Sequence, residues 1–464
     1  MPFVLGVDSS SQSTVVELRD ADRGEIFGSG RASYADPGSS IEQEPLAWWN
    51  ALVDARRDAG GALGVGAVAV AAQLHGLVVV DQEGQVIRPA RMGNDPEAGR
   101  DAESLVHALG GPEQWAHAGG SVPDSSFAVA KLAWLRRTEP GEFARVAKVM
   151  SPHSWLTFRL SRKVVTDRAG ASATGFYSPR DNEWRPDLLA FVDPDKSWGP
   201  CLPRVLETSQ PAGDRDGVMI AAGTGEPMAA ALGVVLRPRD VVVSLDHGYV
   251  FTVRDRPTED PSGRVQGLAD DTGRFLPCVS STGAMGALTS FARVLGVDSN
   301  RFDRLALEAP PGAHGVTLRP AGTGIGPGRR DVRGVLSGFD ADLSPELVAR
   351  AAVEGVAHQI LDDVDALRHA DVPVGGRFVL LGGGRSHALT QALADLSGRA
   401  IALPKGDRAV AGACVLAAAA FHGSGPEELA VAWGLDRARE LEPDPNVDAE
   451  ELRSAHKSAT RYDG

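Results

Sequence analysis

The chain has 464 residues, 43% of them hydrophobic and 23% charged, so its length and composition predict a soluble globular protein of two or three domains. The formal net charge of −14 argues against nucleic acid or an anionic membrane as the main partner, and no apolar run reaches the roughly 18 residues that a membrane span requires. Because Cys201, Cys278 and Cys414 are far apart and share no metal-type spacing, we expect reduced, mostly buried thiols and a cytoplasmic location.

The first predicted element is a β-hairpin over residues 2–20. The apolar run PFVLGV leads to Asp8 and a string of hydroxyl residues, and a second apolar run ends at Arg19-Asp20. Hydroxyl and backbone N–H groups at such a tip can surround phosphate oxygens, and one carboxylate can hold the metal that accompanies them. An ordinary solvated turn is the alternative interpretation.

Alternating helices and strands follow the hairpin. The pattern at 44–63 predicts a helix with Leu46, Trp49, Leu52 and Val53 on one face. The next elements are a buried strand at 66–72, the segment QLHG at 73–76, a strand at 77–81, a polar loop at 91–101, helices at 125–137 and 154–160, and the start of another near 184–189.

Residues 241–255 repeat the design of the first hairpin. An apolar run, a polar tip at 246–248 and a second apolar run end at Arg254-Asp255. The repeat predicts a duplicated architecture in which the two polar tips face each other across a cleft. We place the boundary between the lobes near the segment VLRPRD, with residues 1–236 and 237–464 as the two units.

The second unit contains further helical patterns. Ser344 and Pro345 offer an N-cap and a first-turn proline for a long helix over 346–367. Residues 377–396 predict a strand, a triple-glycine turn and a helix, and residues 440–464 predict a surface helix with a loose tail.

Together these residues carry a resemblance to a known family. Over nearly its whole length the chain resembles the FGGY carbohydrate kinases, and within them it is most similar to xylulokinases of the actinobacterial type. No single motif is decisive, but the order and spacing of nine motifs are specific: DSSSQST, QLHG, NDPEAGR, GSVPDSSFAVAKLAWL, TDRAGASATGFYSP, GTGEPMAAALG, VVVSL, LLGGG and AVAGACVLAAA.

The resemblance implies an α/β fold with two ribonuclease-H-like lobes, of the actin-like ATPase type, around a central cleft. It implies that residues 1–236 form the sugar side and residues 237–464 the nucleotide side. The implied reaction is the ATP-dependent phosphorylation of a small sugar, xylulose or a related pentulose or polyol, with Mg²⁺ as the metal. Sugar and ATP are therefore the expected partners.

The resemblance also assigns roles to individual positions. Asp8 matches the acid on the metal and phosphate side, and Glu226 stands at the position of the general base. The segments that contact the sugar correspond to Gln73, Leu74, His75 and Asp95; for His75 alone a structural role, as a turn histidine bonded to backbone, is the alternative. The nucleotide side corresponds to Ser11, Gln12, Ser13, Asp246, His247, Gly248, Gly383, Gly384 and Arg385.

Several positions depart from the family pattern, among them Gly93, Val15 and the short spacing between the triple glycine and Arg385-Ser386, and two of the motifs depart further. Glu226-Pro227 replaces Asp-Asn, which moves the carboxylate out by roughly 1.5 Å and removes a side-chain amide. At the second tip, residues 246–249 read Asp-His-Gly-Tyr instead of Gly-Thr-Ser-Gly. An acid facing a triphosphate is repulsive unless a metal lies between them.

Three interpretations of the function are therefore open. The first is an active sugar kinase of altered preference. The second is a catalytically impaired homologue that binds sugar or nucleotide as a sensor or partner protein. The third is a structural or chaperone ATPase of the same fold, against which the QLHG and NDPEAGR segments argue. The sequence names neither the sugar nor the oligomeric state, for which a homodimer is one option.

Overall fold

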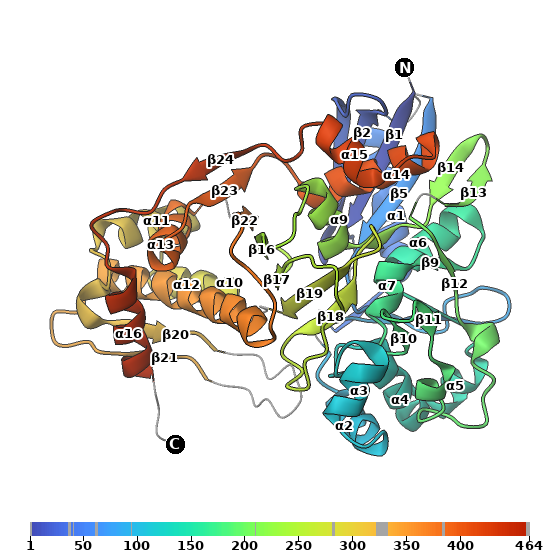
Figure 1. Cartoon of the computed structure of the whole chain (residues 1–464), viewed down its shortest axis with the longest axis horizontal. Helices are drawn as coiled ribbons and strands as arrows, with labels where there is room; N and C mark the ends of the chain where they lie inside the picture. Colours follow the sequence, from blue (N-terminus) through green and yellow to red (C-terminus); the bar gives the residue numbers. More distant parts are fainter. Residues whose placement is uncertain are drawn as a thin grey trace.

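The computed structural model describes residues 2–35, 39, 41–60, 64–93, 95–208, 210–280, 284–321, 333–382 and 386–460. Two seven-stranded mixed sheets dominate these residues, one from each half of the sequence (Figure 1). The predicted α/β fold with two lobes is confirmed by this arrangement.

The first sheet has the strand order β13-β14-β5-β1-β2-β3, with β15 paired to β5. β1 and β2 pair antiparallel, and β5 pairs parallel with β1, so the predicted hairpin and the buried strand that follows it are confirmed. Its strands are β1 (Phe3–Ser9), β2 (Ser13–Asp20), β3 (Ile26–Ser33), β5 (Val65–Ala72), β13 (Pro211–Arg215), β14 (Val218–Ala221) and β15 (Thr224–Gly225).

The side chains of β1 alternate between two helices on opposite faces of the sheet. Leu5 and Val7 pack in the core beneath α1 (Pro45–Asp58), whereas Val4 packs against α14 (Arg408–His422). Gly6 also faces α14, because a Cβ there would lie 2.5 Å from the sulfur of Cys414. Since residues two apart in a strand share a face, Asp8 lies on the α14 face as well.

The second sheet has the order β18-β19-β17-β16-β22-β23-β24. β16 and β17 form an antiparallel hairpin and β22 pairs parallel with β16, which repeats the arrangement of β1, β2 and β5 and confirms the predicted duplication. The strands are β16 (Val241–Ser244), β17 (Tyr249–Phe251), β18 (Gln266–Ala269), β19 (Phe275–Ser280), β22 (Phe378–Leu381), β23 (Ile401–Pro404) and β24 (Ala438–Leu441).

The helices beside the second sheet, apart from α16, form its core together with the strands. Helix α12 begins as predicted, because the Ser344 hydroxyl accepts a hydrogen bond from the backbone N–H of Leu347 at 3.4 Å. The C-terminal segment contains α16 with no buried residue, but its first residues belong to the edge strand β24 rather than to a helix or tail. These helices are α10 (Ala284–Val294), α11 (Ser299–Glu308), α12 (Pro345–His369), α13 (His387–Ser397) and α16 (Ala449–Thr460).

A helical region is inserted between β5 and β13. Its helices are α2 (Gly99–Ala108), α3 (Pro112–Gly119), α4 (Ala128–Thr138), α5 (Pro140–Arg145), α6 (Pro152–Ser161), α7 (Arg168–Ser172), α8 (Pro186–Leu189) and η1 (Gly199–Cys201). Helices α2 to α5 lie below the first sheet in Figure 1, whereas α6 packs into the core of that sheet. Short strands pair around the inserted region: β4 (Glu42–Gln43) with β7 (Ala90–Arg91), β6 (Val78–Val80) with β8 (Lys148–Met150), β9 (Val165–Asp167) with β12 (Arg204–Leu206), and β10 (Tyr177–Ser178) with β11 (Glu183–Trp184). In the second half, the short helix η2 (Ala313–Gly315) precedes β20 (Thr317–Arg319), which pairs with β21 (Val335–Ser337).

Helix α1 buries only part of the predicted face, because Leu52 is buried and Trp49 half-buried but the other two predicted residues are not. Trp48 and Ala55 are buried, whereas Leu46 and Val53 are 52% and 40% exposed. The cause is a close approach of the helix to β3, since a Cβ at Gly30 would lie 2.0 Å from the carbonyl oxygen of Ala55. Small residues on the inner face permit this contact, and a hydrophobic pattern alone does not indicate it.

Helices α9 (Glu226–Gly233) and α14 cross at a very short distance. A Cβ at Gly412 would lie 1.8 Å from the carbonyl oxygen of Ala229, and a Cβ at Gly233 would lie 1.9 Å from that of Arg408. The helix that begins with Glu226 is thereby fixed against the helix that covers Asp8. Figure 1 shows α14 and α15 (Pro426–Ala432) beside β1, although both come from the second half of the sequence.

In the described ranges no single helix is long and apolar enough to cross a membrane. Helices α14 and α15, which are bent by 117° relative to each other, have the length and composition of a membrane span only when they are taken together.

Candidate active site

Asp8 lies near the end of β1, opposite Val15 of β2, and its side chain is buried. Its Oδ1 atom has no hydrogen-bond partner. Burial raises the pKa of the Asp8 carboxyl well above its usual range, and the charges of Asp407 and Asp246 raise this pKa further, against the opposing effect of Arg31. The negative charge of an ionised Asp8 is therefore only weakly balanced by the protein, and a bound cation would balance it.

The tip between β1 and β2 contains three of the residues predicted to bind nucleotide. The side chains of Ser11 and Gln12 are exposed. Ser13 is buried, and its hydroxyl accepts a hydrogen bond from Nη2 of Arg31 at 2.9 Å. Only the first two side chains are therefore open to a ligand without displacing a protein partner.

Glu226 is the first residue of α9 and its side chain is buried. Its Oε1 atom has no hydrogen-bond partner and lies 3.7 Å from Nε2 of His247. Burial raises the pKa of Glu226 well above its usual range, and the charges of Asp8 and Asp407 raise this pKa further. Pro227 occupies the first turn, where a helix leaves its N–H groups unpaired, so the missing N–H removes no helical hydrogen bond.

His247 lies at the tip between β16 and β17 and faces the same point. The Oγ atom of Ser244 is 3.0 Å from Nδ1 of His247, which leaves Nε2 directed at Glu226. Asp8, Glu226 and His247 each offer one ligand atom, and these three atoms all lie within 4.8 Å of one another. The end of β1, the start of α9 and the second tip therefore meet at one place. That the two tips face each other across a cleft stays a prediction.

The rest of the second tip lies against the turn that follows β22. Gly382 has a φ of +66°, and a Cβ there would lie 2.3 Å from Cγ of Asp246. Gly248 has a φ of +68°, which an L side chain rarely adopts. The predicted nucleotide residues Gly383, Gly384 and Arg385 lie outside the described residues.

The segment QLHG connects the first tip to α9. Nε2 of Gln73 donates a hydrogen bond to the carbonyl oxygen of Ser10 at 2.9 Å. A Cβ at Gly225 would lie 2.6 Å from Cδ1 of Leu74, so Leu74 packs against the residue that precedes Glu226. Both predicted sugar residues thus lie beside the centre, and both have partners within the protein.

His75 is buried with a φ of +63° and uses both ring nitrogens. Nδ1 lies 3.1 Å from the carbonyl oxygen of Ala173, and Nε2 lies 2.9 Å from Oε1 of Gln266. Burial lowers the pKa of His75. A sugar hydroxyl that bonded to this ring would have to displace one of these partners, so its predicted role in sugar binding remains a prediction.

Asp95 belongs to a second group of buried charges. Its carboxylate accepts hydrogen bonds from Nε of Arg91 and, at 2.9 Å, from the backbone N–H of Glu97. Lys131 donates to the carbonyl oxygen of His75, and burial lowers the pKa of Lys131 to about 7. Within the described part of the chain no hydrogen bond or ion pair joins Asp95 to Glu226.

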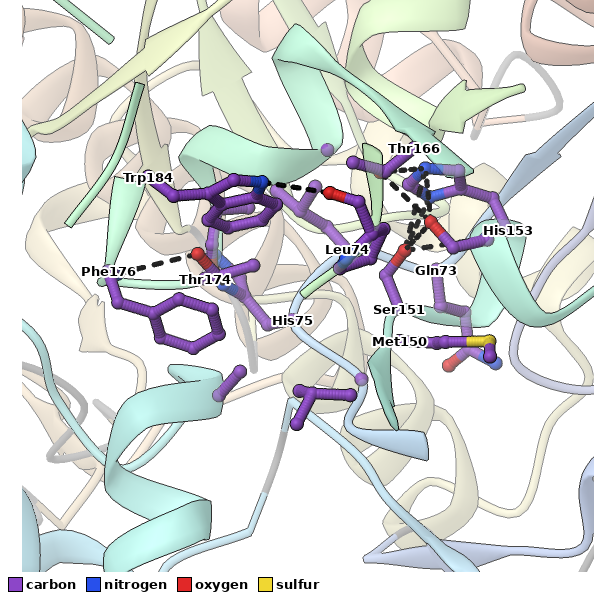
Figure 2. Close-up of a pocket in the computed structure, with 17 residues that line it drawn as sticks. Gln73, Leu74, His75, Met150, Ser151, His153, Thr166, Thr174, Phe176 and Trp184 are labelled. Carbon is purple, nitrogen blue, oxygen red and sulfur yellow. Dashed lines mark hydrogen bonds between the residues drawn. The ribbon is translucent and has the colours of Figure 1, made fainter. Parts of the chain in front are cut away.

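A small cavity lies beside the QLHG segment (Figure 2). Figure 2 shows Ser151, His153 and Thr166 gathered on one side of the cavity, and Nε2 of His153 also lies 2.9 Å from Oδ1 of Asp167. The cavity volume is about 20 Å³, which holds about one water molecule and is too small for a sugar.

Two further residues near the centre belong to no motif. Asp407 caps α14, where it accepts hydrogen bonds from the N–H groups of Ala409 and Val410 at 3.0 and 3.2 Å, and its charge acts on all three central side chains. The hydroxyl of Tyr34 donates to the carbonyl oxygen of Ser10 at 2.6 Å. An acid before an apolar helix predicts the cap, but the approach of Asp407 to Asp8 is a tertiary feature.

Solved structures define the class of this architecture. The chain is similar to the xylulose kinase of Bifidobacterium adolescentis, with 29% identity and a TM-score of 0.82 over 98% of this chain and 99% of that one. The Plasmodium falciparum glycerol kinase with ADP shares the fold at 17% identity, with a TM-score of 0.82 over 98% and 96% of the two chains. The fold is thus that of a two-domain sugar kinase.

Sequence comparisons identify the family. The N-terminal domain of the FGGY family of carbohydrate kinases matches residues 3–233, and the C-terminal domain of that family matches residues 282–421. The chain is 37% identical to the xylulose kinase of Streptomyces coelicolor over 447 residues, which cover 93% of this chain and 91% of that protein. The chain therefore belongs to the FGGY family of carbohydrate kinases and is xylulokinase-like.

Proposed function

We propose that the protein transfers the γ-phosphoryl group of ATP to a hydroxyl of xylulose or a related pentulose or polyol. The observation that carries this proposal is the meeting of Asp8, Glu226 and His247 from three separate segments within 4.8 Å. Xylulose kinases of two Streptomyces species, at 36% and 37% identity, support this choice of sugar.

Glu226 acts as the general base in this proposal. Its carboxylate takes the proton of the sugar hydroxyl, whose oxygen then bonds to the γ-phosphorus while the bond from that phosphorus to the ADP oxygen breaks. Burial and the charges of Asp8 and Asp407 raise the pKa of Glu226, which makes its ionised form a stronger base. The longer side chain places this base roughly 1.5 Å further from the backbone than an aspartate.

Asp8 serves the phosphate side. Its unpartnered, buried Oδ1 fits a divalent cation such as Mg²⁺, which would neutralise charge on the phosphates when bound with ATP. Ser11 and Gln12 at the first tip and Gly248 at the second would approach the phosphates. In this assignment residues 1–236 supply the sugar side and residues 237–464 the nucleotide side, in a cytoplasmic enzyme.

One observation favours a second candidate function. The charges of Asp246 and Asp407 act on Asp8, which itself neighbours Glu226, so four acids surround the place where the phosphates would lie. Without a cation these acids repel a triphosphate. An impaired homologue that binds sugar or nucleotide as a sensor is the alternative that follows.

Sugar-dependent ADP release separates the two candidates. Purified wild-type protein would be assayed with MgATP and a panel of pentuloses, pentoses and polyols, and calorimetry with MgATP alone would measure nucleotide binding. The kinase predicts turnover with at least one pentulose or polyol. Nucleotide or sugar binding without turnover on any member of the panel would favour the sensor.

A further inference from the structure

We propose that Asp8, Glu226 and His247 form a binding site for a divalent first-row transition-metal ion, and that His247 makes this site prefer such an ion to Mg²⁺. The proposal concerns the same centre as the kinase function but does not depend on turnover. It would hold for an inactive homologue as well, because it concerns binding of the metal alone.

The geometry supplies three donors from three elements. Asp8 comes from the end of β1, Glu226 from the start of α9 and His247 from the β16–β17 tip. Their ligand atoms lie within 4.8 Å of one another. Donors at about 2.1 Å from one ion are roughly 3 to 4 Å apart, so small side-chain rotations bring these atoms into coordination distance.

Two of the donors lack any other partner. Oδ1 of Asp8 and Oε1 of Glu226 are buried and form no hydrogen bond, in residues that are only 2% and 3% exposed. Buried carboxylate oxygens are almost always hydrogen-bonded or bound to a cation, because leaving them unpaired is costly. Both of these atoms belong to the same trio, and one cation between them would satisfy both.

The third donor distinguishes among cations. Mg²⁺ takes oxygen ligands almost exclusively, whereas imidazole nitrogen is a favoured ligand of Zn²⁺, Ni²⁺ and related ions. The Oγ atom of Ser244 lies 3.0 Å from Nδ1 of His247, so the ring can donate from Nδ1 and keep the Nε2 lone pair for a metal. This outer partner orients the ring as ligating histidines are commonly oriented.

The two roles of Glu226 would use different oxygens. A carboxylate that binds a metal through one oxygen keeps its second oxygen for another partner. Coordination through Oε1, the atom that faces His247, would leave Oε2 for the proton of a sugar hydroxyl. Three protein ligands also leave coordination positions open, as catalytic metal sites do.

Titration of the full-length chain with Mn²⁺ tests the proposal in the absence of sugar and ATP. The electron paramagnetic resonance signal of free Mn²⁺ would report binding, and Mg²⁺ would serve as the competitor. We expect one Mn²⁺ per chain that about a tenfold excess of Mg²⁺ does not displace. His247→Ala should weaken Mn²⁺ binding by at least about 10-fold and leave Mg²⁺ binding nearly unchanged.

Ser244→Ala and a surface histidine provide matched variants. Ser244→Ala should weaken Mn²⁺ binding by about 10-fold, because the ring loses its outer partner. His107→Ala removes an exposed histidine of α2 and should bind Mn²⁺ as the wild type does. This control separates the central site from weak binding to the negatively charged surface.

Three results would overturn the proposal: no stoichiometric Mn²⁺ binding, equal displacement by Mg²⁺, or unchanged Mn²⁺ affinity in a folded His247→Ala protein. If that variant fails to fold, the wild type labelled with ¹⁵N decides the question, since a bound imidazole gives a nitrogen coupling in pulsed resonance spectra and its absence refutes ligation. Tight Mn²⁺ binding without sugar turnover would refute the kinase function alone.

Discussion

The Nε2 atom of His75 lies 2.9 Å from Oε1 of Gln266, and this contact joins the QLHG segment of the first half to strand β18 of the second sheet. We expect Gln266→Leu to lower the free energy of unfolding by about 1–3 kcal/mol, because it leaves a buried ring nitrogen unpaired. If His75 also positions the sugar, KM for the sugar should rise. Urea denaturation and steady-state kinetics measure the two effects.

Gln114→Leu, at an exposed position of α3, is the control for that substitution. It should change the free energy of unfolding by less than about 0.5 kcal/mol. Equal stability of the Gln266 and Gln114 variants would show that the contact between the two halves contributes nothing measurable.

Gly412→Ala should destabilise the contact between α9 and α14. The added Cβ would lie 1.8 Å from the carbonyl oxygen of Ala229, so the helices must separate, at a cost of about 1–3 kcal/mol. Gly286 is the matched control, since it also lies in a helix but a Cβ added there would meet no atom within 4 Å. Thermal unfolding of Gly286→Ala should show no loss of stability, and a Gly412→Ala protein as stable as the wild type would refute the close packing.

Lys131 makes stability depend on pH in a defined direction. Burial lowers the pKa of Lys131 to about 7 in the folded chain, whereas an unfolded lysine keeps a pKa of about 10.4. Between these values the unfolded chain holds a proton that the folded chain lacks, so this group makes the free energy of unfolding rise with pH. The contribution of Lys131 to the free energy of unfolding is least favourable below about pH 7 and becomes more favourable as the pH rises above that value.

Lys131→Met removes this dependence. The free energy of unfolding of the wild type minus that of the variant should increase by at most about 1.4 kcal/mol per pH unit above about pH 7. Lys163→Met, at an exposed position, should follow the wild type at every pH. Denaturation curves for the three proteins between about pH 6 and pH 9 measure this, and a constant difference between the wild type and Lys131→Met would contradict it.

Local patterns in the sequence predict the framework of the fold. Apolar runs on both sides of a polar tip indicate the two hairpins, and Ser344 with Pro345 indicates the start of α12. The inner face of α1 is not predictable in this way. It depends on how closely β3 approaches the helix backbone, which the glycine at position 30 permits.

The candidate site is predictable only in part. Motif positions single out Asp8, Glu226 and His247, but their meeting depends on the packing of α14 and on the pairing of β16 with β17. The partner of His75 lies 191 residues further along the chain, in β18, and no local pattern indicates it. The sequence predicts Asp407 only as a helix N-cap. It gives no indication that the charge of Asp407 acts on Asp8.

In the proposed reaction, Glu226 accepts the proton of the sugar hydroxyl. The most direct measurement is the rate of xylulose-dependent ADP release by the wild type and by Glu226→Gln, at saturating ATP and metal. We predict that kcat falls by about 10²–10⁴-fold while KM for the sugar changes little, because the amide keeps the shape of the carboxylate but cannot take the proton. Sugar-dependent turnover that is the same in Glu226→Gln as in the wild type would contradict the account.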